Sequence, residues 1–345
     1  MSSIARSLVE LLFCLFSRLM NPSVGPPFTH QLWPHKAHFI GSFTPRARPS
    51  HYLTCIADLL EVYRLDIQSY EIDGEIRIVP LVINTQGWIK GLGGELLHRI
   101  EDMACPSHYF IFQTGEDLAP ADIRAKSPRS SFQPLVLWLE VQANPNPRYT
   151  STDLRNLSMM AYLHSAQPSR SYQPICFMPP WEIDTTVAYD SILLLGSGGE
   201  DVDGSMISDA LQGGLVGIVM DSTGEELKNK FVQSLVPYDG SDSFPSPSTS
   251  QCLGMGIVRW ISRDARTLHL VTPLPAHALA SCRSIIKGDM ELPLWALLPY
   301  AMEGLDDSDL EAQFMTAPFL SWGTSRGLGV AKWKFRRNIL RRIHM

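Results

Sequence analysis

The stretch from residue 76 to residue 114 constrains the fold most, because apolar runs alternate there with an amphipathic segment. Residues 76–83 (IRIVPLVI) have the composition of a buried strand, although Pro80 makes Leu81–Asn84 the safer core of that strand. A glycine-containing turn and a helix from about Gly94 to Met103 follow, and residues 108–114 (HYFIFQT) have the pattern of the next strand. This order predicts a βαβ unit with a parallel sheet and therefore an α/β fold.

Other elements of the first half follow from local patterns. Residues 52–63 carry an apolar face at helical spacing, and residues 135–141 predict a strand. Thr150 with Asp153 three residues later predicts a capped helix that runs to about His164.

The second half differs from the first in its expected secondary structure. Beyond a Pro/Ser-rich linker at residues 167–174, we expect a β-rich domain with small helices and a disordered Ser/Pro/Asp segment. The expected strands lie at 192–195, 215–220, 254–261 and 267–271, the last two as a hairpin, with a helix at 205–211 and disorder at 241–250.

The length and charge of the chain limit the number of domains and the classes of partner. A chain of 345 residues suggests two domains, at about 100–200 residues each. The net charge is −6, but residues 332–342 hold six of the 29 basic residues, so the remaining 23 face 35 acidic ones, a net of −12. The negative net charge of the whole chain therefore does not exclude a nucleic-acid partner. The basic cluster is typical of a nuclear or nucleolar address, or of a solvated tail.

Several kinds of site are not indicated. The six cysteines lie at least 30 residues apart, which is no zinc spacing and suggests reduced thiols in an intracellular protein. His30, His35 and His38 match no standard metal spacing, so we expect hydrogen-bonded or surface histidines. No apolar run is long enough to cross a membrane, and Gly91-Leu92-Gly93 lacks the third glycine of a dinucleotide-binding loop.

The most specific segment is residues 84–94 (NTQGWIKGLGG), between the expected strand and helix. Backbone amides in such a turn can cradle phosphate. Trp88 could point outward, where an indole can stack on a base, or be buried in the core, and the residues alone leave both open.

This segment resembles the T-x-G-W-x-K-G-x-G segment of the polynucleotide 5′-hydroxyl-kinase family, in its nucleolar branch that processes ribosomal RNA. The basic C-terminus is similar to that branch as well. Further segments agree in order: GPPFTH (25–30), GSFTPR (41–46), RYTSTDLRNL (148–157), PPWE (179–182), GEDV (199–202), LVGIV (215–219) and KGDMELP (287–293).

The resemblance implies roles for particular residues. It makes Trp88 and its loop a clasp for the substrate's terminal nucleotides, and it places the Gly41–Arg48 segment, with Thr44 as the best candidate, near the polynucleotide phosphates. It makes Arg148 and Arg155 lid residues, whose fixed charge suits a transferring phosphoryl group. The residues alone favour Thr44 as a turn residue before Pro45 and Arg155 as an exposed helix arginine paired with an acid, and the resemblance reverses that preference. The substrate-binding residues so implied are Thr44, Thr85, Gly87, Trp88 and Lys90, and no metal ligand is implied.

The resemblance also defines the expected domains. It implies a partial P-loop-type kinase domain at residues 24–166, then a smaller mixed C-terminal domain at 175–331 and a basic tail at 332–345. Residues 1–23 remain unassigned. The chain has no G-x-x-x-x-G-K-[ST] pattern, and residues 8–16 could replace the strand before the phosphate loop but carry no D-x-D.

The expected function follows from this pattern. We expect an ATP- and Mg²⁺-dependent polynucleotide 5′-hydroxyl kinase of ribosomal RNA processing, acting on 5′ ends of RNA or DNA. We expect it in the nucleus and nucleolus, with a nuclease or RNA-processing subunit as partner and no membrane. These 345 residues would lack the catalytic front end, through an incomplete sequence or true degeneration, and would be inactive alone. The alternative is a non-catalytic module that binds RNA or a partner.

Overall fold

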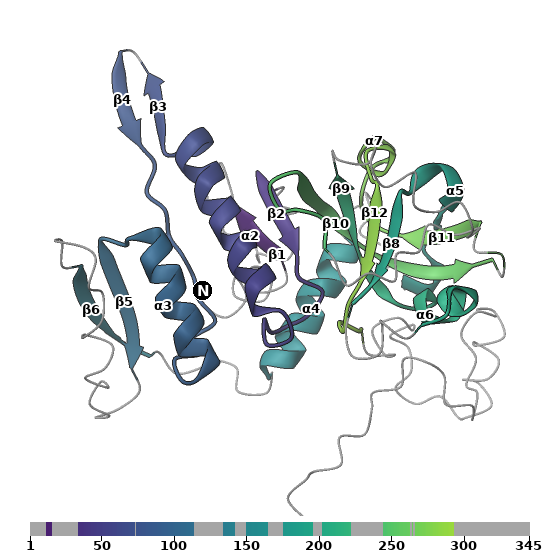
Figure 1. Cartoon of the computed structure of the whole chain (residues 1–345), viewed down its shortest axis with the longest axis horizontal. Helices are drawn as coiled ribbons and strands as arrows, with labels where there is room; N and C mark the ends of the chain where they lie inside the picture. Colours follow the sequence, from purple (N-terminus) through teal and green to yellow (C-terminus); the bar gives the residue numbers. More distant parts are fainter. Residues whose placement is uncertain are drawn as a thin grey trace, which may run out of the picture.

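The structure, a computed structural model, describes residues 12–15, 34–72, 74–113, 134–141, 150–164, 175–195, 202–221, 244–262, 264 and 266–292. Within these residues, one six-stranded sheet, three two-stranded sheets and the helices that pack beside them make up the main parts of the fold (Figure 1). Among its described helices, none is long and apolar enough to cross a membrane.

The first part of the chain contains most of the helical residues. Its elements are β1 (Leu12–Leu15), β2 (Lys36–Phe39), α2 (Pro49–Val62) with a π turn (Tyr63–Ile67), β3 (Ser69–Ile72), β4 (Glu75–Ile78), α3 (Leu92–Ala104), β5 (His108–Gln113), β6 (Leu135–Glu140) and α4 (Ser151–Leu163).

Short helices and longer strands follow in the second part. They are a 3₁₀ turn (Ile175–Phe177), β7 (Trp181–Asp184), α5 (Thr185–Ala188), β8 (Ser191–Leu194), a 3₁₀ turn (Gly204–Met206), α6 (Ile207–Leu211), β9 (Leu215–Asp221), β10 (Ser250–Ile261), β11 (Thr267–Val271), α7 (Ala276–Ala280) and β12 (Ser284–Lys287).

The second-half strands form the six-stranded sheet in the order β7-β11-β10-β9-β12-β8. All neighbours pair antiparallel except β12 and β8, which pair parallel. The predicted hairpin is confirmed, because Ile257 of β10 lies opposite Val271 of β11. The strands predicted at 192–195 and 215–220 and the helix predicted at 205–211 are confirmed within a residue or two.

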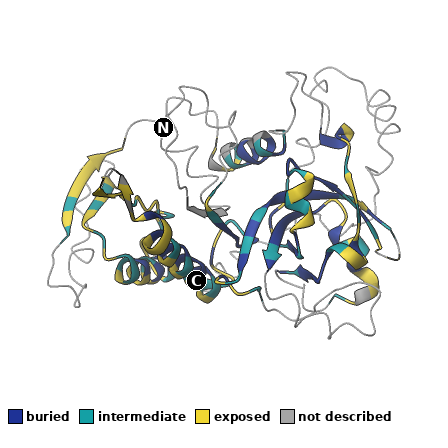
Figure 2. Ribbon diagram, turned by 90° about the horizontal axis from the view of Figure 1, so that it is seen from above, coloured by how far each residue is buried: buried dark blue, intermediate teal, exposed yellow. Residues whose placement is uncertain are grey.

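Both faces of this sheet are buried (dark blue in Figure 2). Along β9, Leu215 and Val219 belong to one apolar cluster, and Val216 and Ile218 to the other, as the alternation of a strand requires. The second cluster includes residues of α6. The first cluster includes Phe39 of β2 together with Met159 and Leu163 of α4, so elements of the first half cover one face.

Helices α2 and α3 pack against each other beside this core. Their contact buries Tyr52, Ile56 and Leu60 of α2 and Leu96 and Ile100 of α3. Both helices lie close to where the apolar periodicity predicts them. The sequence also predicts a capping box on α4, and the structure confirms it: Thr150 and Asp153 satisfy each other's backbone amides.

The predicted strand at Leu81–Asn84 is wrong, and with it the βαβ unit over residues 76–114. The apolar run instead contributes β4, which pairs antiparallel with β3 in a local hairpin at Gly74, and residues 79–90 are neither helix nor strand. Pro80 has no amide hydrogen and restricts the residue before it, so the run cannot continue a ladder. A parallel pair does exist, but it joins β5 to β6, with α3 before both strands.

Two further expectations concern the Ser/Pro/Asp segment and the strand within residues 8–16. Of the segment predicted to be disordered, residues 244–250 form an ordered turn, in which the Ser250 amide donates to the Ser246 carbonyl at 2.9 Å. Phe244 anchors this turn, because its ring stacks on His51 of α2 with centroids 3.6 Å apart. Within residues 8–16, Leu12–Leu15 form β1, antiparallel to β2, and its role as the strand before a phosphate loop stays a prediction. The linker at 167–174 lies outside the described residues, and the domain boundaries stay a prediction.

Candidate functional site

The turn at residues 41–48 connects β2 to α2 and is held tightly at its first residue. Gly41 has φ +73°, and its carbonyl accepts from the Asp289 amide at 2.7 Å. A Cβ atom on Gly288 would collide with the Gly41 backbone, so only glycine fits where these segments cross. The segment after β12 therefore fixes where this turn begins.

Within the turn, side-chain hydroxyls order the backbone. The Thr44 amide donates to Ser42 Oγ at 3.4 Å, and the Arg46 amide donates to Thr44 Oγ1 at 3.4 Å. Thr44 is exposed, and a hydroxyl that accepts one hydrogen bond can still donate another to a ligand. The reading of Thr44 as a turn residue is therefore confirmed, and it is compatible with ligand binding.

Trp88 lies on the irregular segment that precedes α3. Its ring rests against Gly93 in the first turn of α3, where a Cβ atom would collide with the ring. The guanidinium carbon of Arg46 lies over the ring, 5.4 Å from its centroid. Trp88 is half-buried: its ring packs on α3 and lies beside Arg46 of the 41–48 turn, and the stacking of a base on it stays a prediction.

Arg155 reaches the same turn from α4. Its guanidinium carbon lies 5.0 Å from the centroid of Phe43, and its Nη2 donates to Thr152 Oγ1 at 3.3 Å. Phe43 packs in turn against the core shared with the six-stranded sheet. Arg155 is half-buried over an aromatic ring, so the alternative reading of it as an exposed helix arginine is wrong, and no ion pair to it is seen among the described residues.

The capping box positions this first turn of α4. Asp153 Oδ2 accepts from the Thr150 amide at 2.8 Å and from its hydroxyl at 2.7 Å. These hydrogen bonds favour the carboxylate and lower the pKa of Asp153 below its usual range.

The structure thus brings three of the predicted site residues, Thr44, Trp88 and Arg155, to one turn. The other described ones, Thr85, Gly87 and Lys90, lie on the segment that carries Trp88, with Gly87 at φ +67° and Lys90 exposed. Arg148 lies outside the described residues. The resemblance implied the segment that contains Arg46 but selected Thr44 within it, and the basic charge of Arg46 two residues later was a usable signal.

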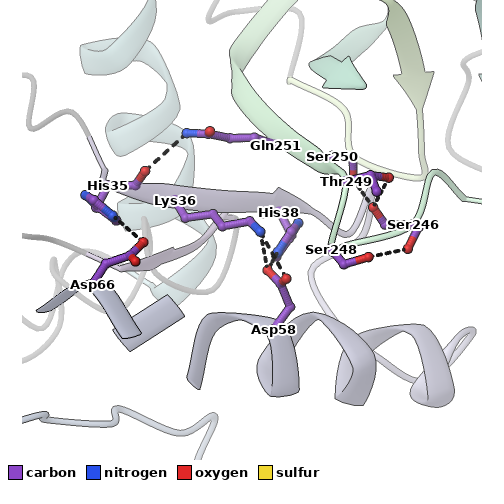
Figure 3. Close-up of polar contacts among 10 residues, drawn as sticks. All are labelled: His35, Lys36, His38, Asp58, Asp66, Ser246, Ser248, Thr249, Ser250 and Gln251. Carbon is purple, nitrogen blue, oxygen red and sulfur yellow. Dashed lines mark hydrogen bonds and ion pairs between the residues drawn. The ribbon is translucent and has the colours of Figure 1, made fainter. Parts of the chain in front are cut away.

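The histidines near β2 take part in polar contacts (Figure 3). His38 Nε2 and Lys36 Nζ both lie 2.7 Å from Asp58 Oδ2, and His35 Nε2 lies 3.4 Å from Asp66 Oδ2. Burial lowers the pKa of His38, against the opposing effect of Asp58. The expectation of hydrogen-bonded histidines is confirmed for His35 and His38, and His30 lies outside the described residues. Within the described ranges, no three His, Cys, Asp or Glu side chains gather as a metal site.

Comparison with known proteins agrees with the resemblance seen in the sequence. Residues 18–165 match the family model of the mRNA cleavage and polyadenylation factor CLP1 P-loop. The chain is 30% identical over 371 residues to polynucleotide 5′-hydroxyl-kinase GRC3 of Cryptococcus neoformans var. neoformans serotype D, covering 94% of this chain and 49% of that protein. It is 28% identical over 370 residues to grc3 of Schizosaccharomyces pombe, covering 93% and 47%.

Among solved structures, the wild-type Clp1p–Pcf11p complex is similar with a TM-score of 0.46 and 13% identity, covering 77% of this chain and 57% of that one. The chain spans about half the length of the curated relatives it matches. The matches to two fungal kinases extend over more than nine-tenths of the chain. On that evidence, the chain belongs to the polynucleotide 5′-hydroxyl-kinase family.

Proposed function

We propose that this chain binds the 5′-hydroxyl end of an RNA or DNA strand, as the acceptor in ATP-dependent phosphorylation. One observation carries the proposal: an indole, an exposed hydroxyl and two arginines converge on the 41–48 turn. The Arg46 guanidinium lies over the Trp88 ring, and the Arg155 guanidinium lies over the Phe43 ring. Phe43 and Arg46 flank Thr44 in the turn.

The chemistry of this set suits a single-stranded polynucleotide. A base that stacks on Trp88 gains about 1–3 kcal/mol without sequence preference, as binding to any 5′ end requires. The Thr44 hydroxyl and the guanidinium groups can donate hydrogen bonds to phosphate oxygens. The positively charged, planar guanidinium group of Arg155 suits the phosphate oxygens of either substrate.

ATP and Mg²⁺ enter the proposal through the family alone. The groups gathered at the turn are aromatic, hydroxyl and guanidinium, whereas Mg²⁺ prefers carboxylate and water oxygens. The described part of the site therefore fits the polynucleotide and does not fit the metal, and we assign no step of phosphoryl transfer to it.

We propose in addition that the protein acts in ribosomal RNA processing in the nucleolus, with a nuclease or another RNA-processing subunit as partner. The ordered family segments and the six basic residues in 332–342 support this. Co-purification of ribosomal RNA precursors and a nuclease with the tagged chain, from nucleoli, would test it.

A second candidate is a non-catalytic binding module. It is favoured by the composition of the 41–48 site, which supplies contacts for a strand and no carboxylate for a metal. Mixing the full chain with ATP, Mg²⁺ and a 5′-hydroxyl oligonucleotide separates the two. Transfer to the 5′ end by this chain, or by a longer gene product tested in parallel, supports the kinase. Binding without transfer by either supports the module, and absence of oligonucleotide binding contradicts the proposed binding of 5′ ends.

Trp88→Ala should weaken oligonucleotide binding by about 1–3 kcal/mol, because one stacked base loses its platform. Fluorescence anisotropy with a labelled 5′-hydroxyl oligonucleotide would measure the loss. Trp260→Ala is a matched control, since Trp260 is 40% exposed on β10 and contacts His269. Equal affinity of the Trp88→Ala and Trp260→Ala variants would remove Trp88 from the site.

A further inference from the structure

We propose that Arg46 is the phosphate-binding residue of this site and that the Trp88 ring positions it. The inference rests on the proposed function and deepens it, because it names the group that would grip the backbone next to the stacked base. The resemblance places the segment that contains Arg46 near the phosphates, but it names Thr44 there, and Arg46 is not among the implied substrate-binding residues.

The backbone of Arg46 is well placed for this role. The Thr44 hydroxyl accepts from the Arg46 amide at 3.4 Å, and the Arg48 amide donates to the Pro45 carbonyl at 3.1 Å. With Gly41 held against Gly288 at the start of the turn, the Cα of Arg46 has a defined position. These backbone contacts do not set the conformation of the Arg46 side chain.

The Trp88 ring selects the direction of that side chain. The guanidinium carbon lies 5.4 Å from the ring centroid, within the range of a cation–π interaction. The guanidinium group is planar, and its N–H donors lie in the plane. A guanidinium group at this distance from an indole can still direct its N–H edges at the two oxygens of a phosphate.

The charge of Arg46 is also available. Arg46 is exposed, and no ion pair to it is seen among the described residues. An uncompensated guanidinium beside a stacking ring would neutralise a phosphate and release its counterions. Lysine could supply the charge, but not the flat stacking surface or the paired donors.

Salt dependence of binding by the full chain tests this. The affinity for a single-stranded 5′-hydroxyl oligonucleotide would be measured across a range of salt concentrations for wild type, Arg46→Gln, Arg46→Lys and Arg99→Gln. Arg99 is the control, because it is an exposed arginine on α3 outside the turn. Loss of one phosphate contact should reduce the slope of log K against log[salt] by about 0.7 in Arg46→Gln. Arg99→Gln should keep the wild-type slope.

Arg46→Lys separates charge from positioning. It should keep most of the salt slope but bind more weakly than wild type, since lysine lacks the planar face that rests on Trp88. Combining Arg46→Gln with Trp88→Ala should cost less than the product of the two single fold-changes, because Trp88 acts partly through Arg46.

The outcomes also separate the two proposals. Wild-type binding with an unchanged slope in Arg46→Gln would overturn the role of Arg46 and leave the proposed function standing. Independent, multiplicative losses would overturn the positioning by Trp88. Failure of the wild-type chain to bind any oligonucleotide would overturn the proposed function and this inference together.

Discussion

At the scale of single residues, buried polar groups in the first half are held by short, specific contacts. Asp58 of α2 accepts from both Lys36 and His38 of β2, and the three side chains are at most 14% exposed. Such a cluster is costly to disturb, because removing one member leaves the others buried without their partner.

Asp58→Asn should lower the free energy of unfolding by about 3 kcal/mol, at the lower end of the range for breaking a buried pair, because Lys36 keeps some contact with water. Chemical denaturation followed by circular dichroism would measure the loss. The matched control is Asp66→Asn, since the His35–Asp66 pair is 37% and 55% exposed and should cost less than about 1 kcal/mol. Equal losses in the two variants would contradict this.

His51 should make the fold sensitive to acid. Burial, with smaller effects of His38 and Arg48, lowers its pKa from 6.5 to about 4. The unfolded chain therefore binds more protons than the folded one between these values, so the free energy of unfolding falls as the pH drops through this window. Above pH 6.5 the group is neutral in both states and contributes no pH dependence.

His51→Phe should reduce this acid sensitivity while keeping a ring stacked on Phe244. Part of the sensitivity should remain, because burial lowers the pKa of His38 as well. Denaturation at several pH values between 4 and 7 would measure the slope, with exposed His277→Gln as a control that keeps the wild-type slope. An unchanged slope in His51→Phe would contradict the assignment.

At the scale of elements, predictions succeeded where local pattern and tertiary packing agree. Helix α3 and strands β5, β9 and β11 lie within about two residues of where the periodicity predicts them. The exception is the apolar run at 76–83, where a local hairpin at Gly74 competes with a buried strand. Its residues Ile76 and Ile78 are 76% and 72% exposed, so apolarity there does not mark burial.

The sequence patterns predict where the strands lie better than they predict which strands pair. Residues 108–113 and 135–140 each have the pattern of a strand, but only the structure pairs them with each other in parallel. Their alternation does not say which face is covered. In the described part of the chain, Phe110 and Phe112 lie on the uncovered face, at 57% and 55% exposure.

At the scale of the whole molecule, the two halves share a core. Phe39 of β2 packs directly against Gly217 of β9, where a Cβ atom would collide with its ring. Met159 of α4, which like Phe39 precedes the predicted linker, belongs to the same cluster as the second-half residues. Because these contacts join segments far apart in the chain, we expect one cooperative unfolding transition.

Gly217→Ala should destabilise both halves by about 1–3 kcal/mol, the usual cost of overpacking a dense core. Unfolding followed by circular dichroism and by tryptophan fluorescence should shift together. Adding Phe39→Leu should make room for the new methyl group, so the double variant should lose less than the sum of the single losses. Separate transitions for the two probes would contradict a shared core.

Most of the elements, the capping box of α4, the charge asymmetry and the family resemblance can be recognised from the amino-acid order alone. These depend on residues close together in the chain, where periodicity and hydrogen-bonding capacity act directly. Only the tertiary structure decided which strands pair, that β2 and α4 cover the second-half sheet, and that Arg46 lies over Trp88. Such contacts depend on shape and distance between segments many residues apart, and local patterns do not encode which partner each surface meets.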